Sequence, residues 1–146
     1  TAIERCVEIK ADIVEQDETE SALRQVLNFG HTVAHGIEKA TNHAVSHGRA
    51  VAFGMVVEAR VAEQLVGFPR QDRQRLEVLL NALGLPIEAP CSFESAATFL
   101  KSDKKSIEGS IRCALPLRIG AMAPAEGRWT IDVPQELLRQ AWTGSK

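Results

Sequence analysis

Apolar residues recur at helical spacing near the start of the chain. Within residues 2–15 they fit the period of an α-helix; they are Ile3, Cys6, Val7, Ile13 and Val14. Asp17 and Glu20 then have the Asp-x-x-Glu spacing of a capping box. A first helix is therefore expected over residues 2–15, and a second is expected to follow Asp17 and to run towards residue 40.

The most apolar segment of the chain follows Ser46, a residue that can cap a helix. The stretch AVAFGMVVEARVAEQLV is apolar on nearly every side through Val57, which is typical of a helix buried in a protein core. Small residues in this region would let neighbouring backbones approach closely; they are Gly48, Ala50, Ala52 and Gly54.

Two further helices are indicated downstream. The stretch QDRQRLEVLLNALGLP predicts an amphipathic helix that ends at Gly84. Its inward residues are expected to be Leu76, Leu79, Leu80 and Leu83. Ser92 can cap a fifth helix that extends to about Lys101.

The last third of the chain carries a β-like pattern. A turn at Glu108 and Gly109 precedes an apolar run, and RWTIDV can pair with that run. Pro134 then opens a closing helix. The expected fold class is mainly α: one multi-helix domain over residues 1–146 with a small β hairpin appendage.

Composition narrows the function classes. The 146 residues are 45% hydrophobic, and the net charge of -2 comes without a basic run, so no nucleic-acid partner is expected. No secretory leader or apolar run of about 18 residues is visible, so no membrane partner is expected. Three cysteines without a CxxC spacing indicate reduced thiols in a cytoplasmic protein. Because the chain opens at Thr1 in a helical pattern, we expect it to be part of a longer protein.

Four polar residues form a candidate ligand-binding stripe. On one continuous helix, Arg24, Asn28, His31 and His35 would fall within a sector of about 60°. The alternative is the solvated face of an ordinary helix, because Gly30 can interrupt the helix and scatter the stripe.

All four histidines lie between residues 31 and 47, in two HxxxH pairs. Imidazoles at positions i and i+4 of one helix can share a metal ion. Histidines that cap or pack a helix are the alternative, and no HExxH motif supplies the general base of a metalloprotease. Taken alone, Lys10 and the cluster Asp103–Lys105 are solvated charges.

Three motifs together resemble one known family. The chain reads LNFGHTVAHGIE, then HGRAVAFGM, then DKK before IRCALPLRIG. In order and spacing these segments are similar to the C-terminal domain of the 3-dehydroquinate synthase family. The resemblance implies part of an enzyme of the shikimate pathway that converts 3-deoxy-D-arabino-heptulosonate 7-phosphate to 3-dehydroquinate and phosphate. It also implies NAD and a divalent metal, zinc or cobalt, as cofactors.

The resemblance assigns roles to individual residues. It implies that His31 and His47 are two of three metal ligands and that His35 faces the substrate and assists proton transfer. Lys10 and Arg24 would hold the substrate carboxylate, with Lys10 also counted as catalytic. Asn28 would lie on the phosphate side, and Lys104 or Lys105 would bind the phosphate. His43 matches no functional position.

The chain departs from the family pattern in three places. Arg49 stands where family members generally have Glu. If its side chain faced the site, its positive charge would oppose a metal ion; if it faced solvent, the substitution would be harmless. We favour the solvent-facing orientation. Ala34 and Gly36 exchange the family's usual Gly and Ala. The family's N-terminal domain, which binds NAD and supplies a glutamate as the third metal ligand, is not in this sequence, so the chain alone is expected to be inactive. With that domain, the full-length protein is expected to be a homodimer.

Two other functions stay open at this point. Another sugar phosphate cyclase, such as 2-deoxy-scyllo-inosose synthase or a valiolone synthase, shares the chemistry, although Lys10 and Arg24 favour a substrate that bears a carboxylate. The other alternative is a non-catalytic helical module that binds a metal or a partner protein.

Overall fold

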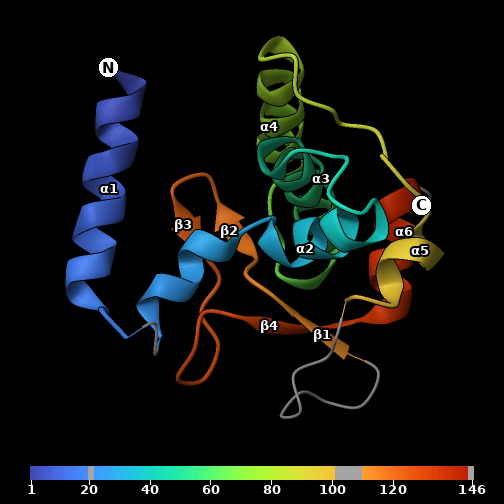
Figure 1. The fold of residues 1–146 in the computed structure, drawn as a ribbon. Coiled ribbons are helices and arrows are strands. Elements are labelled where there is room, and N and C mark those ends of the chain that lie inside the picture. Colours follow the sequence, from blue (N-terminus) through green and yellow to red (C-terminus); the bar gives the residue numbers. More distant parts are fainter. Residues whose placement is uncertain (20–21, 101–109, 145–146) are drawn as a thin grey trace.

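Helices dominate the structure, a computed structural model that describes residues 1–19, 22–100 and 110–144. They follow one another in the order α1 (Ala2–Gln16), a 3₁₀ helix η1 (Leu23–Asn28), α2 (His31–Ala40), α3 (His47–Leu65), α4 (Arg70–Ala82), α5 (Phe93–Ala97) and α6 (Gln135–Thr143). Short strands lie between α5 and α6 (Figure 1). The predicted fold class, mainly α with a small β appendage, is confirmed.

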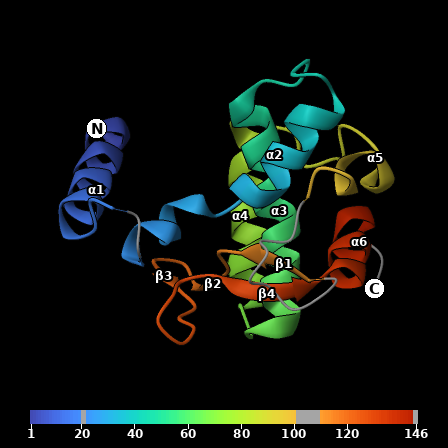
Figure 2. The same ribbon diagram turned by 60° about the horizontal axis from the view of Figure 1, so that its bottom comes forward.

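Helix α3 is the centre of the core. It packs against α2, α4 and α6 (Figure 2) and also contacts the strand β2 (Pro116–Arg118). Phe53 and Val57 on α3 and Ile37 on α2 are completely buried. The prediction of a buried helix after Ser46 is therefore confirmed, and α3 is the scaffold that fixes the start of α2.

Helix α1 lies apart from helices α2 to α6 in both views (Figures 1 and 2) and contacts η1. Thr1 and Glu4 form a complete capping box at its start, yet none of its residues is buried. Ile3 is 77% exposed and Val7 is 62% exposed. The apolar side of α1 is thus exposed in its first half, whereas Ile13 and Val14 near its end are partly buried, where α1 contacts η1.

The second predicted helix is wrong in detail. Gly30 adopts a left-handed conformation (φ +83°) and separates η1 from α2. Glu20, the other member of the predicted capping box, lies outside the described residues. The Oδ2 of Asp17 accepts hydrogen bonds from the backbone N–H groups of Ala22 and Arg24, each at 2.9 Å. The chain between α1 and α2 is therefore shaped by Asp17 and Gly30.

Two other helices differ from expectation. On α4, Leu80 is buried as predicted, but Leu79 is 56% exposed and Leu83 is 65% exposed, because only one side of α4 meets α3. Ser92 caps α5 as predicted, with its Oγ accepting from the N–H of Ser95 at 3.2 Å. Helix α5 ends at Ala97, earlier than predicted.

Four short strands form two antiparallel pairs. The segment β1 (Ser110–Cys113) pairs with β4 (Ile131–Pro134), as predicted for RWTIDV. A second pair, β2 (Pro116–Arg118) and β3 (Ala121–Met122), was not predicted. The predicted turn at residues 108–109 lies outside the described residues. Helix α6 begins directly after Pro134, as expected.

None of the described helices combines the length and the apolarity needed to cross a membrane.

Candidate metal and substrate site

Two histidines from different helices lie side by side. His31 is the first residue of α2 and His47 is the first residue of α3. Their ring centroids are 5.2 Å apart, with an interplanar angle of 59°. Two imidazoles that share a tetrahedral zinc ion at a Zn–N distance of about 2.1 Å have centroids roughly 5 Å apart. The spacing of this pair is therefore suited to a metal ion.

Both rings are anchored through the same nitrogen. The Nδ1 of His31 lies 3.2 Å from the carbonyl oxygen of Phe29, and the Nδ1 of His47 lies 2.9 Å from Oε1 of Glu38. A carbonyl and a carboxylate can only accept, so each Nδ1 carries the hydrogen and donates it. In the neutral rings the lone pair is then on Nε2, the form in which histidine binds a metal.

Cationic side chains share a hollow with His31. The hollow measures about 300 Å³, and its lining residues are Lys10, Arg24, Leu27, Asn28 and His31. Two hydrogen bonds fix Arg24: its backbone N–H donates to Oδ2 of Asp17, and its Nη1 donates to the carbonyl oxygen of Glu18 at 3.3 Å. The structure thus brings together four of the predicted site residues from α1, η1 and α2.

A second hollow of about 580 Å³ adjoins the first through Asn28, which lines both. His35 lines this second hollow, and its ring centroid lies 6.2 Å from that of His31. Lys39 and Arg112 also line it, although the sequence analysis did not select them. The four residues of the predicted stripe therefore line two adjoining hollows instead of one continuous helix face, because Gly30 separates η1 from α2.

Other predicted positions fall elsewhere. Lys104 and Lys105 lie outside the described residues. His43 is exposed in the turn before α3, in a left-handed conformation (φ +59°). Arg49 is exposed and stands two positions after His47, a spacing at which helical side chains do not face each other. The structure therefore agrees with the solvent-facing orientation that we favour for Arg49.

Sequence reasoning missed two carboxylates near the histidines. Glu38 contacts His47, as described above. Glu58 is completely buried on α3, and its Oε2 accepts a 2.6 Å hydrogen bond from the N–H of Gly30. Burial raises the pKa of Glu58 to about 8, although backbone hydrogen bonds act in the opposite direction. The signal that could have revealed Glu58 is a single charge within an otherwise apolar run.

No group of three His, Cys, Asp or Glu side chains in residues 1–19, 22–100 and 110–144 is arranged to hold a metal ion. His31 and His47 therefore lie side by side as a pair, without a third such side chain among the described residues.

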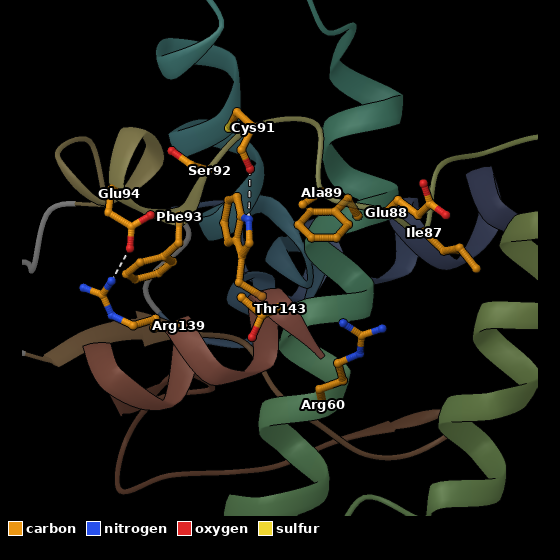
Figure 3. A pocket seen from close by; sticks show the side chains of 12 residues that line it. Arg60, Ile87, Glu88, Ala89, Cys91, Ser92, Phe93, Glu94, Arg139 and Thr143 are labelled. Carbon is orange, nitrogen blue, oxygen red and sulfur yellow. Dashed lines mark hydrogen bonds and ion pairs between the residues drawn. The ribbon is translucent and has the colours of Figure 1, made fainter. Parts of the chain in front are cut away.

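A separate pocket of about 520 Å³ lies between α3, α5 and α6 (Figure 3). Two of its polar side chains already have partners within the protein. The indole N–H of Trp142 donates to the carbonyl of Cys91 at 3.1 Å, and Arg139 forms an ion pair with Glu94. Because no predicted site residue lines this pocket, we do not regard it as the functional site.

The fold is that of the sugar phosphate cyclases. The structure of 2-deoxy-scyllo-inosose synthase complexed with carbaglucose-6-phosphate, NAD⁺ and Co²⁺ has a TM-score of 0.88 to this chain at 24% identity. The match covers 99% of this chain and 41% of that protein. For 2-epi-5-epi-valiolone synthase from Streptomyces hygroscopicus with NAD⁺ and Zn²⁺ bound, the TM-score is 0.73 at 22% identity, over 94% of this chain and 37% of that protein.

Sequence comparison gives the family. Residues 1–106 match the family described as 3-dehydroquinate synthase C-terminal, and the chain belongs to that family. The 3-dehydroquinate synthase of Acaryochloris marina is 44% identical over 143 residues, which are 96% of this chain and 37% of the relative. That of Thermodesulfovibrio yellowstonii is 44% identical over 124 residues, covering 82% of this chain and 34% of the relative. The chain thus spans little more than a third of the length of these relatives.

Proposed function

We propose that this chain is the metal- and substrate-binding C-terminal part of a cytoplasmic 3-dehydroquinate synthase. The full-length enzyme would convert 3-deoxy-D-arabino-heptulosonate 7-phosphate to 3-dehydroquinate and phosphate in the shikimate pathway. The observation that carries the proposal is the pair of His31 and His47, anchored at Nδ1 and adjoining a hollow that contains Lys10 and Arg24.

The histidine pair is the proposed metal site. His31 and His47 would hold zinc or cobalt through Nε2, with a third ligand from the part of the enzyme that precedes this chain. When bound, the metal polarises a substrate oxygen, and NAD, bound mainly by the N-terminal domain, carries the hydride chemistry. The donor chemistry fits, because imidazole suits both zinc and cobalt.

The cationic hollow is the proposed substrate site. Arg24 suits a bidentate contact with the substrate carboxylate, and Lys10 adds a second positive charge in the same hollow. Asn28 lines both hollows and so can contact a substrate that spans them. His35, in the second hollow, is proposed to assist proton transfer, and Lys104 or Lys105 to bind the phosphate.

The exposed side of α1 is the proposed contact with the N-terminal domain. Ile3 and Val7 project from this helix into solvent. Next to α1, an apolar groove of about 870 Å³ includes Ile13, Leu79 and Trp129 in its lining. Exposed apolar side chains beside an apolar groove support the proposal of an interaction site here. Because the relatives are about two and a half times as long as this chain, the preceding domain of the same polypeptide is the expected occupant. The complete enzyme is proposed to be a homodimer.

The test uses the full-length protein with alanine at His31, at His47 and, as a matched control, at His43. We expect the first two variants to lose bound zinc, measured by mass spectrometry of metal content, and to lose 3-dehydroquinate formation. The His43 variant should keep both. Zinc retained by both of the first two variants would refute the metal site.

A second assay separates this function from that of a related cyclase, because the fold alone is common to several. The wild-type protein is offered 3-deoxy-D-arabino-heptulosonate 7-phosphate and, separately, glucose 6-phosphate, which lacks the carboxylate. Turnover of the first and not the second is expected from Arg24 and Lys10; the reverse would favour the inosose synthase alternative.

A further inference from the structure

The two helices that carry the histidine pair hold each other through carboxylates. Glu38 lies towards the end of α2, and its Oε1 accepts the Nδ1–H of His47, the first residue of α3. The side chain of Glu38 is only 14% exposed, whereas that of His47 is 57% exposed. The more restricted partner of this contact is therefore Glu38, which orients the more accessible ring.

The reverse contact runs from α3 to the start of α2. Glu58 on α3 accepts from the N–H of Gly30 at 2.6 Å and from the N–H of Val33 at 3.4 Å. Helix α2 has Gly30 at its N-cap and no side-chain cap of its own. Unpaired N–H groups at a buried helix start destabilise a protein. Glu58 accepts from these groups and so caps α2, as a Ser or Asp side chain at the N-cap usually does.

These two contacts converge on the same pair of residues. Glu38 fixes the ring of His47 directly, and Glu58 fixes the backbone on both sides of His31. A ligand held in one tautomer and one orientation loses less freedom when the metal binds, which is why such supporting groups raise metal affinity.

We propose that Glu38 and Glu58 are positioning residues of the metal site. Glu38 on α2 orients the first residue of α3, and Glu58 on α3 holds the first turn of α2. This inference rests on the proposed function, in which His31 and His47 bind the metal. It adds that metal affinity depends on two acidic side chains that are not themselves ligands.

The experiment measures zinc affinity of the full-length protein by competition with a chromophoric chelator. Glu38→Ala is expected to weaken zinc binding by about 10- to 100-fold, and Glu38→Gln, which keeps an acceptor for His47, by less. Glu58→Met removes both acceptors and should also weaken binding, whereas Glu58→Gln keeps one. Glu63→Ala is the matched control on α3, because Glu63 pairs with Arg73 and does not touch the histidines.

A second measurement does not depend on metal or on the buried Glu58 variants. Nitrogen-15 NMR of histidine in the metal-free protein reports which ring nitrogen carries hydrogen. The Nδ1–H form of His47 is expected in the wild type and is expected to lose population in Glu38→Ala, with His43 unchanged.

The outcomes separate the two ideas. Wild-type zinc binding that His31→Ala abolishes but that Glu38→Ala leaves within twofold would overturn the positioning role and leave the proposed function intact. A wild-type protein that binds no zinc would overturn the metal site of the proposed function, and the positioning role with it.

Discussion

Gly54 on α3 lies directly against the carbonyl group of Gly30, at the break before α2. An ideal Cβ built at Gly54 would come closer than 3.0 Å to that carbonyl oxygen. Real Cβ atoms essentially never approach so closely, and the obstacle is backbone rather than a flexible side chain. The absence of a side chain at Gly54 therefore sets the separation of α2 and α3, and with it the position of His31.

Gly54→Ala is expected to destabilise the protein by at least about 1–3 kcal/mol, the usual cost of overpacking a core. Gly48→Ala is the matched control, since Gly48 lies on the same helix with nothing within 4 Å of its ideal Cβ. That control should be neutral or stabilising by up to about 1 kcal/mol. Denaturant unfolding of both variants measures the difference, and equal stabilities would contradict this account of the contact.

The same pair of glycines shows what the sequence could and could not predict. An apolar run through Val57 is enough to predict a buried helix, because periodicity reports burial directly. The bend at Gly30 depends on contact with Gly54, 24 positions away, and no local pattern encodes that contact. The small residues before Val57 were expected to permit close packing, and this is correct at Gly54 but wrong at Gly48, which faces open space.

The site shows a similar division. Residues that lie within one or two turns of each other, such as Asn28 and His31, could be grouped from spacing even though the helix between them is interrupted. Glu38 and Glu58 could not, because their partners are backbone groups or rings on the neighbouring helix. A carboxylate that supports a ligand looks, in sequence, like any other helical glutamate.

Burial of Glu58 predicts a specific dependence of stability on pH. Its pKa rises from 4.5 to about 8 on folding, so between these values the folded state keeps a proton that the unfolded state releases. Stability from this group is therefore present below about pH 4.5 and is lost as the pH rises towards 8. The loss approaches about 1.4 kcal/mol per pH unit within that window.

Glu58→Gln cannot release this proton. The difference in free energy of unfolding between Glu58→Gln and the wild type should therefore change across pH 5–8 in favour of the variant, and Glu63→Gln on the same helix should not show the change. Denaturant titrations at each pH measure it. Parallel curves for Glu58→Gln and the wild type would show that Glu58 is already ionised at neutral pH.

Arg24→Lys tests the proposed carboxylate contact. A lysine keeps the charge but cannot form two parallel hydrogen bonds, so we expect a loss of roughly 1.5–3 kcal/mol, or about 10- to 150-fold in kcat/KM of the full-length enzyme. Zinc content should be unchanged, because Arg24 is not placed as a metal ligand. Arg70→Lys, at an exposed residue of α4, is the control. A loss of zinc together with activity would instead indicate that Arg24 supports the fold.

The apolar side of α1 provides the last prediction. If the preceding domain covers this helix, Ile3→Ser with Val7→Ser should destabilise the full-length protein, because each buried aliphatic side chain contributes about 1.5–3 kcal/mol. Val78→Ser on α4 is matched in exposure, since Val78 is 69% exposed, and it should have little effect. Thermal unfolding and hydrogen exchange of α1 measure both variants. Equal stability of the double variant and the control, with rapid exchange along α1, would mean that this helix stays exposed in the complete enzyme and that the domain contact lies elsewhere.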